Sequence, residues 1–221
     1  MAYPLPDRPI GRHPGWPAKL PALRVRAGVV ALRPVRLRDG GAWSAIRIRD
    51  EAHLAPWEPT LPGTWIQRNS SIEWPGRWLQ LRGAARRGTA LPFAVTVDGQ
   101  FAGHVMVGNV VREPLLSAYV GYWVDSQVAG GGVITAAVAT VADHCFGPVG
   151  LHRLEATVRP ENAASLRVLA KLGFRQEGLF RRYLDVDGAW RDHLSFALTA
   201  EELPRTGLTG RLIAEGRATR E

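Results

Sequence analysis

The sequence has a single cysteine, Cys145, and no long apolar run. One cysteine excludes an internal disulfide framework and any metal site built from a cysteine cluster. The longest weakly polar stretch, residues 133–142, is about half as long as a transmembrane helix must be. Prolines and arginines interrupt the first residues, where a signal peptide needs an uninterrupted apolar block. We therefore expect no metal, no membrane span and no export by that route, and a reducing, cytoplasmic compartment fits.

Acidic residues are scarce at the N-terminus. Residues 1–38 contain eight arginines and lysines but only one acidic residue, Asp7, so this segment accounts for most of the net charge of +8. The rest of the chain is close to neutral, which is typical of a basic arm attached to an ordinary domain. Such an arm either contacts RNA or a ribosomal surface or only keeps the chain in solution. No ladder of aromatic and basic residues, which would stack on bases, accompanies it.

The remaining composition is that of a folded protein. With 221 residues, 46% of them hydrophobic and 22% charged, the chain has room for one sizeable domain. We expect a basic Pro/Arg-rich arm over residues 1–27, the domain over residues 28–203 and a Gly-, Thr- and Arg-rich tail over residues 204–221. The sequence leaves open whether the chain is a monomer or a homodimer.

Hydrophobic periodicity predicts an α+β fold. A period of two predicts about seven strands, at residues 29–33, 93–97, 101–110, 115–124, 153–158, 174–184 and 190–198. Helical periodicity predicts helices after Asp39, between Ser70 and Gly88, and over residues 134–145 and 162–172. Asp98-Gly99 and Asp187-Gly188 are typical of type I′ turns in hairpins. The order of elements indicates a mixed, mostly antiparallel sheet with flanking helices.

Three consecutive glycines, Gly130 to Gly132, lie between a strand and a helix. Amides exposed at a helix N-terminus form an anion site, which suits a diphosphate. The segment lacks the Gly-Lys-Ser/Thr ending of a Walker A loop, and Thr135 stands where a dinucleotide fingerprint needs glycine. The glycines are equally consistent with a flexible turn and a tight contact between helix and strand.

Two spaced motifs favour the anion site over a purely structural turn. Gln127-Val-Ala-Gly130-Gly-Gly132 resembles the pyrophosphate loop of the GCN5-related N-acetyltransferases, and Asn162-Ala-Ala-Ser165 with Lys171-Leu-Gly-Phe174 resembles the second half of their signature. More narrowly, three segments resemble the RimJ branch of the RimJ/RimL subfamily, the ribosomal-protein alanine N-acetyltransferases: His53-Leu-Ala-Pro-Trp-Glu-Pro59, Asn109-Val-Val-Arg112 and Tyr183-Leu-Asp-Val-Asp-Gly-Ala-Trp-Arg-Asp-His193. The resemblance spans about residues 28–200.

The resemblance implies acetyl-CoA as cofactor and a twisted sheet whose central strand pair splays apart. It implies that the backbone of the strand before the loop contacts pantetheine, that the loop holds the diphosphate and that Asn162 bonds the pantetheine arm. The cofactor-binding residues so implied are Tyr122, Trp123, Val124, Gln127, Val128, Gly130, Gly131, Gly132, Val133, Ile134, Thr135, Asn162 and Ser165.

Acyl transfer to an amine needs a neutral amine, an oxyanion stabiliser and a proton for the leaving thiolate. We expect direct attack by the amine, with Val124 N–H facing the oxyanion and Ser165 as the acid. Leu184 stands where the RimL branch has a glutamate base, so the base is undecided. Glu58 is the first choice for contacting the amine and Glu113 the second. Trp57, Glu58, Glu113 and Tyr183 are the expected substrate-binding residues.

The expected function is acetylation of a protein N-terminal α-amine, plausibly of a ribosomal protein that begins with alanine or serine. One alternative is a small-amine acetyltransferase, which predicts a strongly acidic groove. Another is a CoA-binding ribosome-assembly or RNA-associated factor, which predicts steep salt dependence.

Overall fold

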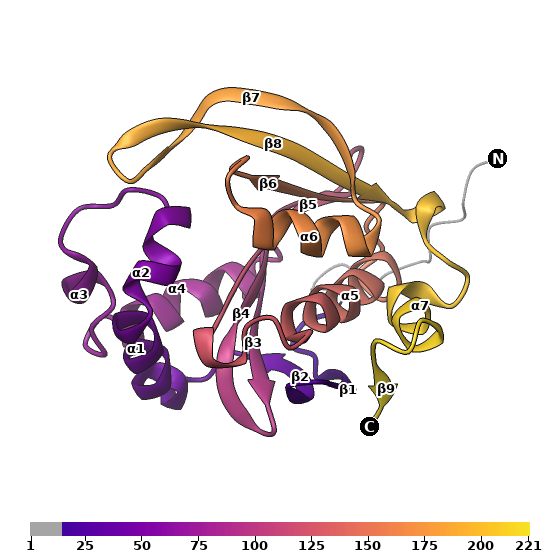
Figure 1. Cartoon of the computed structure of the whole chain (residues 1–221), viewed down its shortest axis with the longest axis horizontal. Coiled ribbons are helices and arrows are strands. Elements are labelled where there is room, and N and C mark those ends of the chain that lie inside the picture. Colours follow the sequence, from indigo (N-terminus) through magenta and orange to yellow (C-terminus); the bar gives the residue numbers. More distant parts are fainter. Residues whose placement is uncertain (1–14) are drawn as a thin grey trace.

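Residues 15–221 are described by the computed structural model, and in this part of the chain nine strands form one sheet (Figure 1). Its order is β7-β8-β6-β5-β4-β3-β2-β1-β9. Every neighbouring pair is antiparallel except β5 and β6, which are parallel. The strands are β1 (Leu20–Val25), β2 (Gly28–Pro34), β3 (Leu91–Val97), β4 (Gln100–Val111), β5 (Ser117–Val124), β6 (Arg153–Val158), β7 (Arg175–Val186), β8 (Ala189–Thr199) and β9 (Thr219–Arg220). The predicted α+β class and mostly antiparallel sheet are confirmed.

Helices cover both faces of the sheet (Figure 1). On β3, Phe93 and Val95 join the larger core with α5, α6 and α7, whereas Ala94 between them packs with Trp43 and Trp74 of α1 and α4. This alternation is what a strand buried on both faces requires. The helices are α1 (Gly40–Arg49), α2 (Glu51–Leu54), α3 (Trp65–Arg68), α4 (Trp74–Arg86), α5 (Val133–Phe146), α6 (Ala163–Leu172) and α7 (Gly207–Ala214), with short 3-10 turns η1 (Leu37–Asp39), η2 (Ala55–Trp57), η3 (Ser126–Val128) and η4 (Ala200–Glu202). None of the helices in the described part is long and apolar enough to span a bilayer.

The two parallel strands separate along their length. Pairing between β5 and β6 ends at Tyr119 and Glu155, although β5 continues to Val124 and β6 to Val158. The backbone groups on that side of residues 120–124 are therefore free of the sheet ladder. This is the splayed central pair that the sequence motifs imply.

The folded domain extends past both expected boundaries. Residues 20–25, assigned to the arm, form β1, where Leu23 is buried against the core. In the assigned tail, α7 buries Leu208 and Leu212 and β9 pairs with β1. These two strands are the additions to the seven predicted ones: β1 forms a hairpin with β2, and β9 pairs with β1 from the other end of the sequence. The rest of the predicted arm, residues 1–14, lies outside the described residues.

Both predicted hairpin turns are present. Asp98 and Gly99 have φ values of 48° and 81°, and Asp187 and Gly188 have 55° and 69°. Two successive positive φ values define a type I′ turn, which asparagine, aspartate and glycine adopt most readily. The second turn matters for the site because Pro59 pairs with Val186 beside it.

Candidate active site

A cavity of about 460 Å³ opens where β5 leaves β6. Along β5 the side chains alternate: Tyr122 and Val124 face α5 and α6, whereas Gly121 and Trp123 face α1 and α4. The cavity touches residues of both kinds, so it passes around the free edge of β5 from one face of the sheet to the other. We call the part lined by Tyr122, Val124, residues 128–135 and α6 the glycine-loop half. The part lined by His53, Leu54, Trp57, Glu58, His104, Met106 and Gly121 is the Trp57 half.

The glycine-loop half is built from backbone. Gly130 and Gly132 have φ values of 73° and 93°, a region that side chains disfavour, and Gly132 is the N-cap of α5. The first intrahelical hydrogen bond is donated by Ala136 to Gly132 O, so the preceding amides of the first turn point out of the helix. Those amides and the helix dipole form an anion site.

Side chains from α1 fix the start of this loop. Asp50 accepts hydrogen bonds from Ser126 N and Ser126 Oγ, each at 2.8 Å, and is paired with Arg49. Arg49 also pairs with Asp125, which accepts from Gln127 N. The hydrogen bond from Arg49, helped by those from Ser126, lowers the pKa of Asp50 to about 2. The start of the loop is therefore hydrogen-bonded to the C-terminal end of α1.

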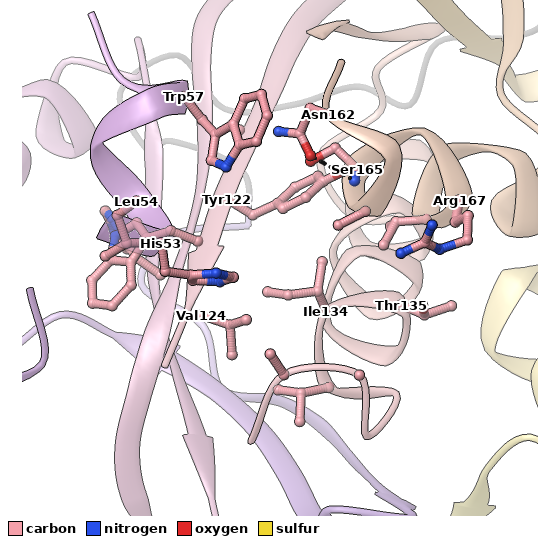
Figure 2. A pocket seen from close by; sticks show the side chains of 18 of the residues that line it. His53, Leu54, Trp57, Tyr122, Val124, Ile134, Thr135, Asn162, Ser165 and Arg167 are labelled. Carbon is pink, nitrogen blue, oxygen red and sulfur yellow. Dashed lines mark hydrogen bonds between the residues drawn. The ribbon is translucent and has the colours of Figure 1, made fainter. Parts of the chain in front are cut away.

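The first turn of α6 forms the opposite wall of the glycine-loop half (Figure 2). Asn162 caps the helix through Oδ1, which accepts from Ser165 N at 3.0 Å, and Gly173 closes it in the left-handed conformation, as predicted. Tyr122 points from β5 across the cavity toward Ser165 (Figure 2). Burial raises the pKa of Tyr122 to about 12, and the Ser165 hydroxyl acts in the opposite direction.

The Trp57 half is built from side chains. Trp57, on η2, extends over the cavity (Figure 2), and Arg159 lies over its ring. Glu58 follows it and accepts a hydrogen bond from Arg47 Nη2. The loop beyond is joined to the β7–β8 turn, because Thr60 Oγ1 donates to Asp185 Oδ1 at 2.7 Å. These contacts place a carboxylate in the cavity and limit its movement.

Arg47, which binds the cavity carboxylate Glu58, was not among the residues predicted from the sequence. Its side chain is only 4% exposed, and its guanidinium lies over the rings of Trp43, Trp65 and Trp123 at 4.9–5.7 Å. Arg47 Nε donates to Asn69, and Trp65 Nε1 donates to Arg47 O. A signal existed, because Arg47 stands four residues after Trp43 and so on the buried stripe of α1.

His104 is a second residue that was missed. It lines the Trp57 half from β4, and its Nε2 is buried with no hydrogen-bond partner among the described residues. Burial, assisted by the charges of Arg77 and Arg47, lowers the pKa of His104 to about 4. The imidazole is therefore neutral at physiological pH.

Most of the predicted residues line the cavity, and four do not. Gln127 belongs to η3 outside it. A Cβ on Gly131 would lie 2.5 Å from that of Ala27, so this glycine permits contact with the β1–β2 turn. Glu113, the second choice for the amine contact, is exposed in the β4–β5 loop, at the other end of the hairpin from the cavity. Tyr183 packs with Phe180 and His193 on the β7–β8 hairpin.

A second cavity, of about 550 Å³, continues from the glycine loop. It shares Gly130, Gly132, Thr135 and Lys171 with the first. Its other basic residues come from segments assigned to the arm and the tail: Arg24, Arg26 and Arg217. Arg26 Nη2 donates to Gly130 O at 2.9 Å. Arg24 and Arg217 are paired with Glu221 and Glu215, so Arg26 is the arginine of the three without a carboxylate partner in the described residues.

Several known proteins are similar to this chain in fold and in sequence. A solved structure of Mycobacterium smegmatis RimJ in complex with CoA-disulfide is 55% identical, covers 95% of this chain and 100% of that chain, and superposes with a TM-score of 0.93. The Escherichia coli ribosomal protein uS5-alanine N-acetyltransferase is 28% identical over 85% of this chain and 96% of the relative. The probable N-acetyltransferase YjcK of Bacillus subtilis is 40% identical, but that match spans 46% of this chain and 56% of the relative.

The family model of the acetyltransferase (GNAT) domain matches residues 30–175, which include β5, the glycine loop, α5 and α6. The family resemblance expected from the two spaced motifs is confirmed. This chain belongs to the GNAT family of acetyltransferases.

Proposed function

We propose that the chain transfers the acetyl group of acetyl-CoA to the N-terminal α-amine of a protein, with a ribosomal protein that begins with alanine or serine as its substrate. Its membership of the GNAT family makes it an acetyl-CoA-dependent N-acetyltransferase. Relatives named for RimJ and for alanine acetylation of ribosomal protein uS5 support the choice of a protein N-terminus.

The observation that carries the proposal is the single cavity shared by both faces of the sheet. An anion site made of amides lies in one half, and a carboxylate held by an arginine lies in the other. Acetyl-CoA supplies the acetyl group as a thioester and carries a diphosphate that the amides of residues 130–135 fit. The free backbone of Tyr122 and Val124 can bind the pantetheine arm, and Asn162 lines the same half.

The chemistry of an α-amine suits this site. Near pH 7.3 an α-amine with a pKa of ~7.8 is about one-quarter neutral, whereas a lysine side chain is neutral about one time in a thousand. The amine therefore needs little help from a base. In our proposal Glu58 orients the amine and accepts its proton through water, Val124 N–H donates to the developing oxyanion and Ser165 donates to the departing sulfur.

The test is CoA release from acetyl-CoA with peptides that begin with Ala, Ser, Thr or Met, beside a lysine-containing peptide whose α-amine is blocked. We expect release confined to unblocked termini, with Ala or Ser fastest. Equal release from the blocked peptide would assign the activity to lysine, and release only with small amines would assign a different acceptor. No release while acetyl-CoA binds would favour a non-catalytic role.

A further inference from the structure

We propose that Tyr122 is a positioning residue for thiolate departure: its hydroxyl donates a hydrogen bond to Ser165 Oγ, which leaves the Ser165 hydrogen for the sulfur. This inference rests on the proposed function. It assigns a side-chain role to a residue for which the family resemblance implies only backbone contacts.

The first observation is an unpartnered hydroxyl in the cavity wall. Tyr122 Oη is buried, and within the described residues no atom forms a hydrogen bond of good geometry with it, Ser165 Oγ being only near it, although Tyr122 lines the glycine-loop half. Buried hydroxyls are normally paired, and the exceptions concentrate where a ligand or a catalytic step completes the network. Packing alone does not explain the choice of tyrosine, because phenylalanine would fill the same space without an unpaired group.

The second observation is the neighbour. Tyr122 belongs to the part of β5 that has left β6, so its ring spans the opened gap toward α6 (Figure 2). There the Ser165 hydroxyl lies near the phenol and lowers its pKa, so in the empty site it acts toward Tyr122 as a donor, while Ser165 N is occupied by the Asn162 cap. The proposed bond reverses this direction when the sulfur takes the Ser165 hydrogen. A serine hydroxyl rotates freely and can accept one hydrogen bond while it donates another. Catalytic hydrogen bonds often reach good geometry only when the ligand is bound.

The pKa values of the Tyr122 phenol and of the leaving thiol determine whether the two hydroxyls transfer a proton or only donate hydrogen bonds. Burial raises the pKa of Tyr122 to about 12, so the phenol stays protonated at any working pH. A simple thiol has a pKa of ~8.5, so neither hydroxyl is acidic enough to protonate the thiolate fully. The hydroxyls therefore act as hydrogen-bond donors. As the C–S bond breaks, its electron pair stays on sulfur and both protons stay on oxygen. A serine that accepts from tyrosine is a stronger donor, because hydrogen bonds in a chain polarise one another.

The test measures the thiolate itself and needs no acceptor. The full-length protein is saturated with CoA, and thiolate absorbance is followed against pH. We expect the pKa of the bound thiol to lie about one unit below that of free CoA, a tenfold gain in thiolate population. In Tyr122→Phe and in Ser165→Ala this pKa should return toward the free value, and the double variant should match the single ones. Acetyl transfer should fall about tenfold in kcat with unchanged KM for acetyl-CoA.

Tyr119→Phe is the matched control, since Tyr119 is on the same strand but outside the cavity. Desulfo-CoA should bind all variants equally. A bound thiol with the same pKa in wild type and Tyr122→Phe would overturn the inference, as would additive effects of the two substitutions. Failure of the proposed function is distinguishable, because it would appear as no transfer to any peptide, whatever the pKa of the bound thiol.

Discussion

The two halves of the cavity are lined by different kinds of chemical group, backbone in one and side chains in the other. In the glycine-loop half the available polar groups are backbone groups of a helix N-terminus and of the β5 edge that β6 leaves unpaired. In the Trp57 half they are side chains, above all Glu58, whose position depends on Arg47 and on three tryptophans. A site made of backbone needs a few residues with special conformations. A site made of side chains needs a whole packed cluster, so its chemistry can change by substitution while the cofactor site stays the same.

The largest expected effect concerns the buried histidine of the Trp57 half. The pKa of His104 falls from 6.5 unfolded to about 4 folded, so the unfolded chain binds more protons between these values. Above pH 6.5 His104 is neutral in both states and does not lower the free energy of unfolding. As pH falls from 6.5 toward 4, the free energy of unfolding decreases by about 3 kcal/mol.

Urea unfolding at a series of pH values measures this loss. His104→Gln should unfold with a flatter pH dependence between pH 6.5 and 4, because glutamine does not titrate. His152→Gln is the control, since His152 is exposed and pairs with Glu201 on the surface. Equal slopes in wild type and His104→Gln would show that His104 does not carry the effect.

The next largest effect should lower catalysis through the Trp57 half and leave CoA binding in the glycine-loop half unchanged. Glu58→Gln keeps the shape of the side chain but removes the charge that Arg47 holds. We expect kcat/KM for an alanine peptide to fall about 30-fold, roughly 2 kcal/mol, with little change in CoA affinity. Glu113→Gln is the matched control, because Glu113 is exposed outside the cavity. Similar losses in both variants would contradict the role of Glu58.

The smallest effect concerns the glycine-loop half. Lys171 lies where the two cavities join, so its charge should attract the phosphates of acetyl-CoA. Lys171→Ala should raise the Kd for CoA about threefold at low salt, less than 1 kcal/mol, because exposed charges are well screened. Titration calorimetry at two salt concentrations measures this, and the difference should shrink at high salt. An unchanged Kd at low salt would remove Lys171 from the cofactor site.

The difference between the halves also explains what the sequence could predict. Glycines at the loop and the asparagine cap of α6 are local signals, so the anion site and its opposite wall were predictable. Glu58 and Glu113 are both loop carboxylates, and only the topology places the first in the cavity and the second at the far end of the β4–β5 hairpin.

Long-range packing accounts for the remaining misses. The surroundings of Arg47 and His104 depend largely on tryptophans and arginines that are distant in the sequence, Trp43 being the one nearby partner of Arg47. Likewise β1 and β9 lack a strong pattern of their own and are strands because they pair with each other and with β2. Periodicity reports which residues face a core, but it does not report which distant segment supplies the partner.

The most direct test of the central claim uses Gly121, whose hydrogen faces open space in the Trp57 half. Its φ is not in the left-handed region, and a Cβ there would meet no atom within 4 Å, so Gly121→Leu should fold normally and fill that half. The measurement is the Kd for CoA together with kcat/KM for the alanine peptide in this one variant. We predict a Kd within about twofold of wild type and a loss of about 100-fold in transfer, roughly 3 kcal/mol. Unimpaired transfer, or an equal loss of CoA binding, would contradict the division of one cavity into two halves.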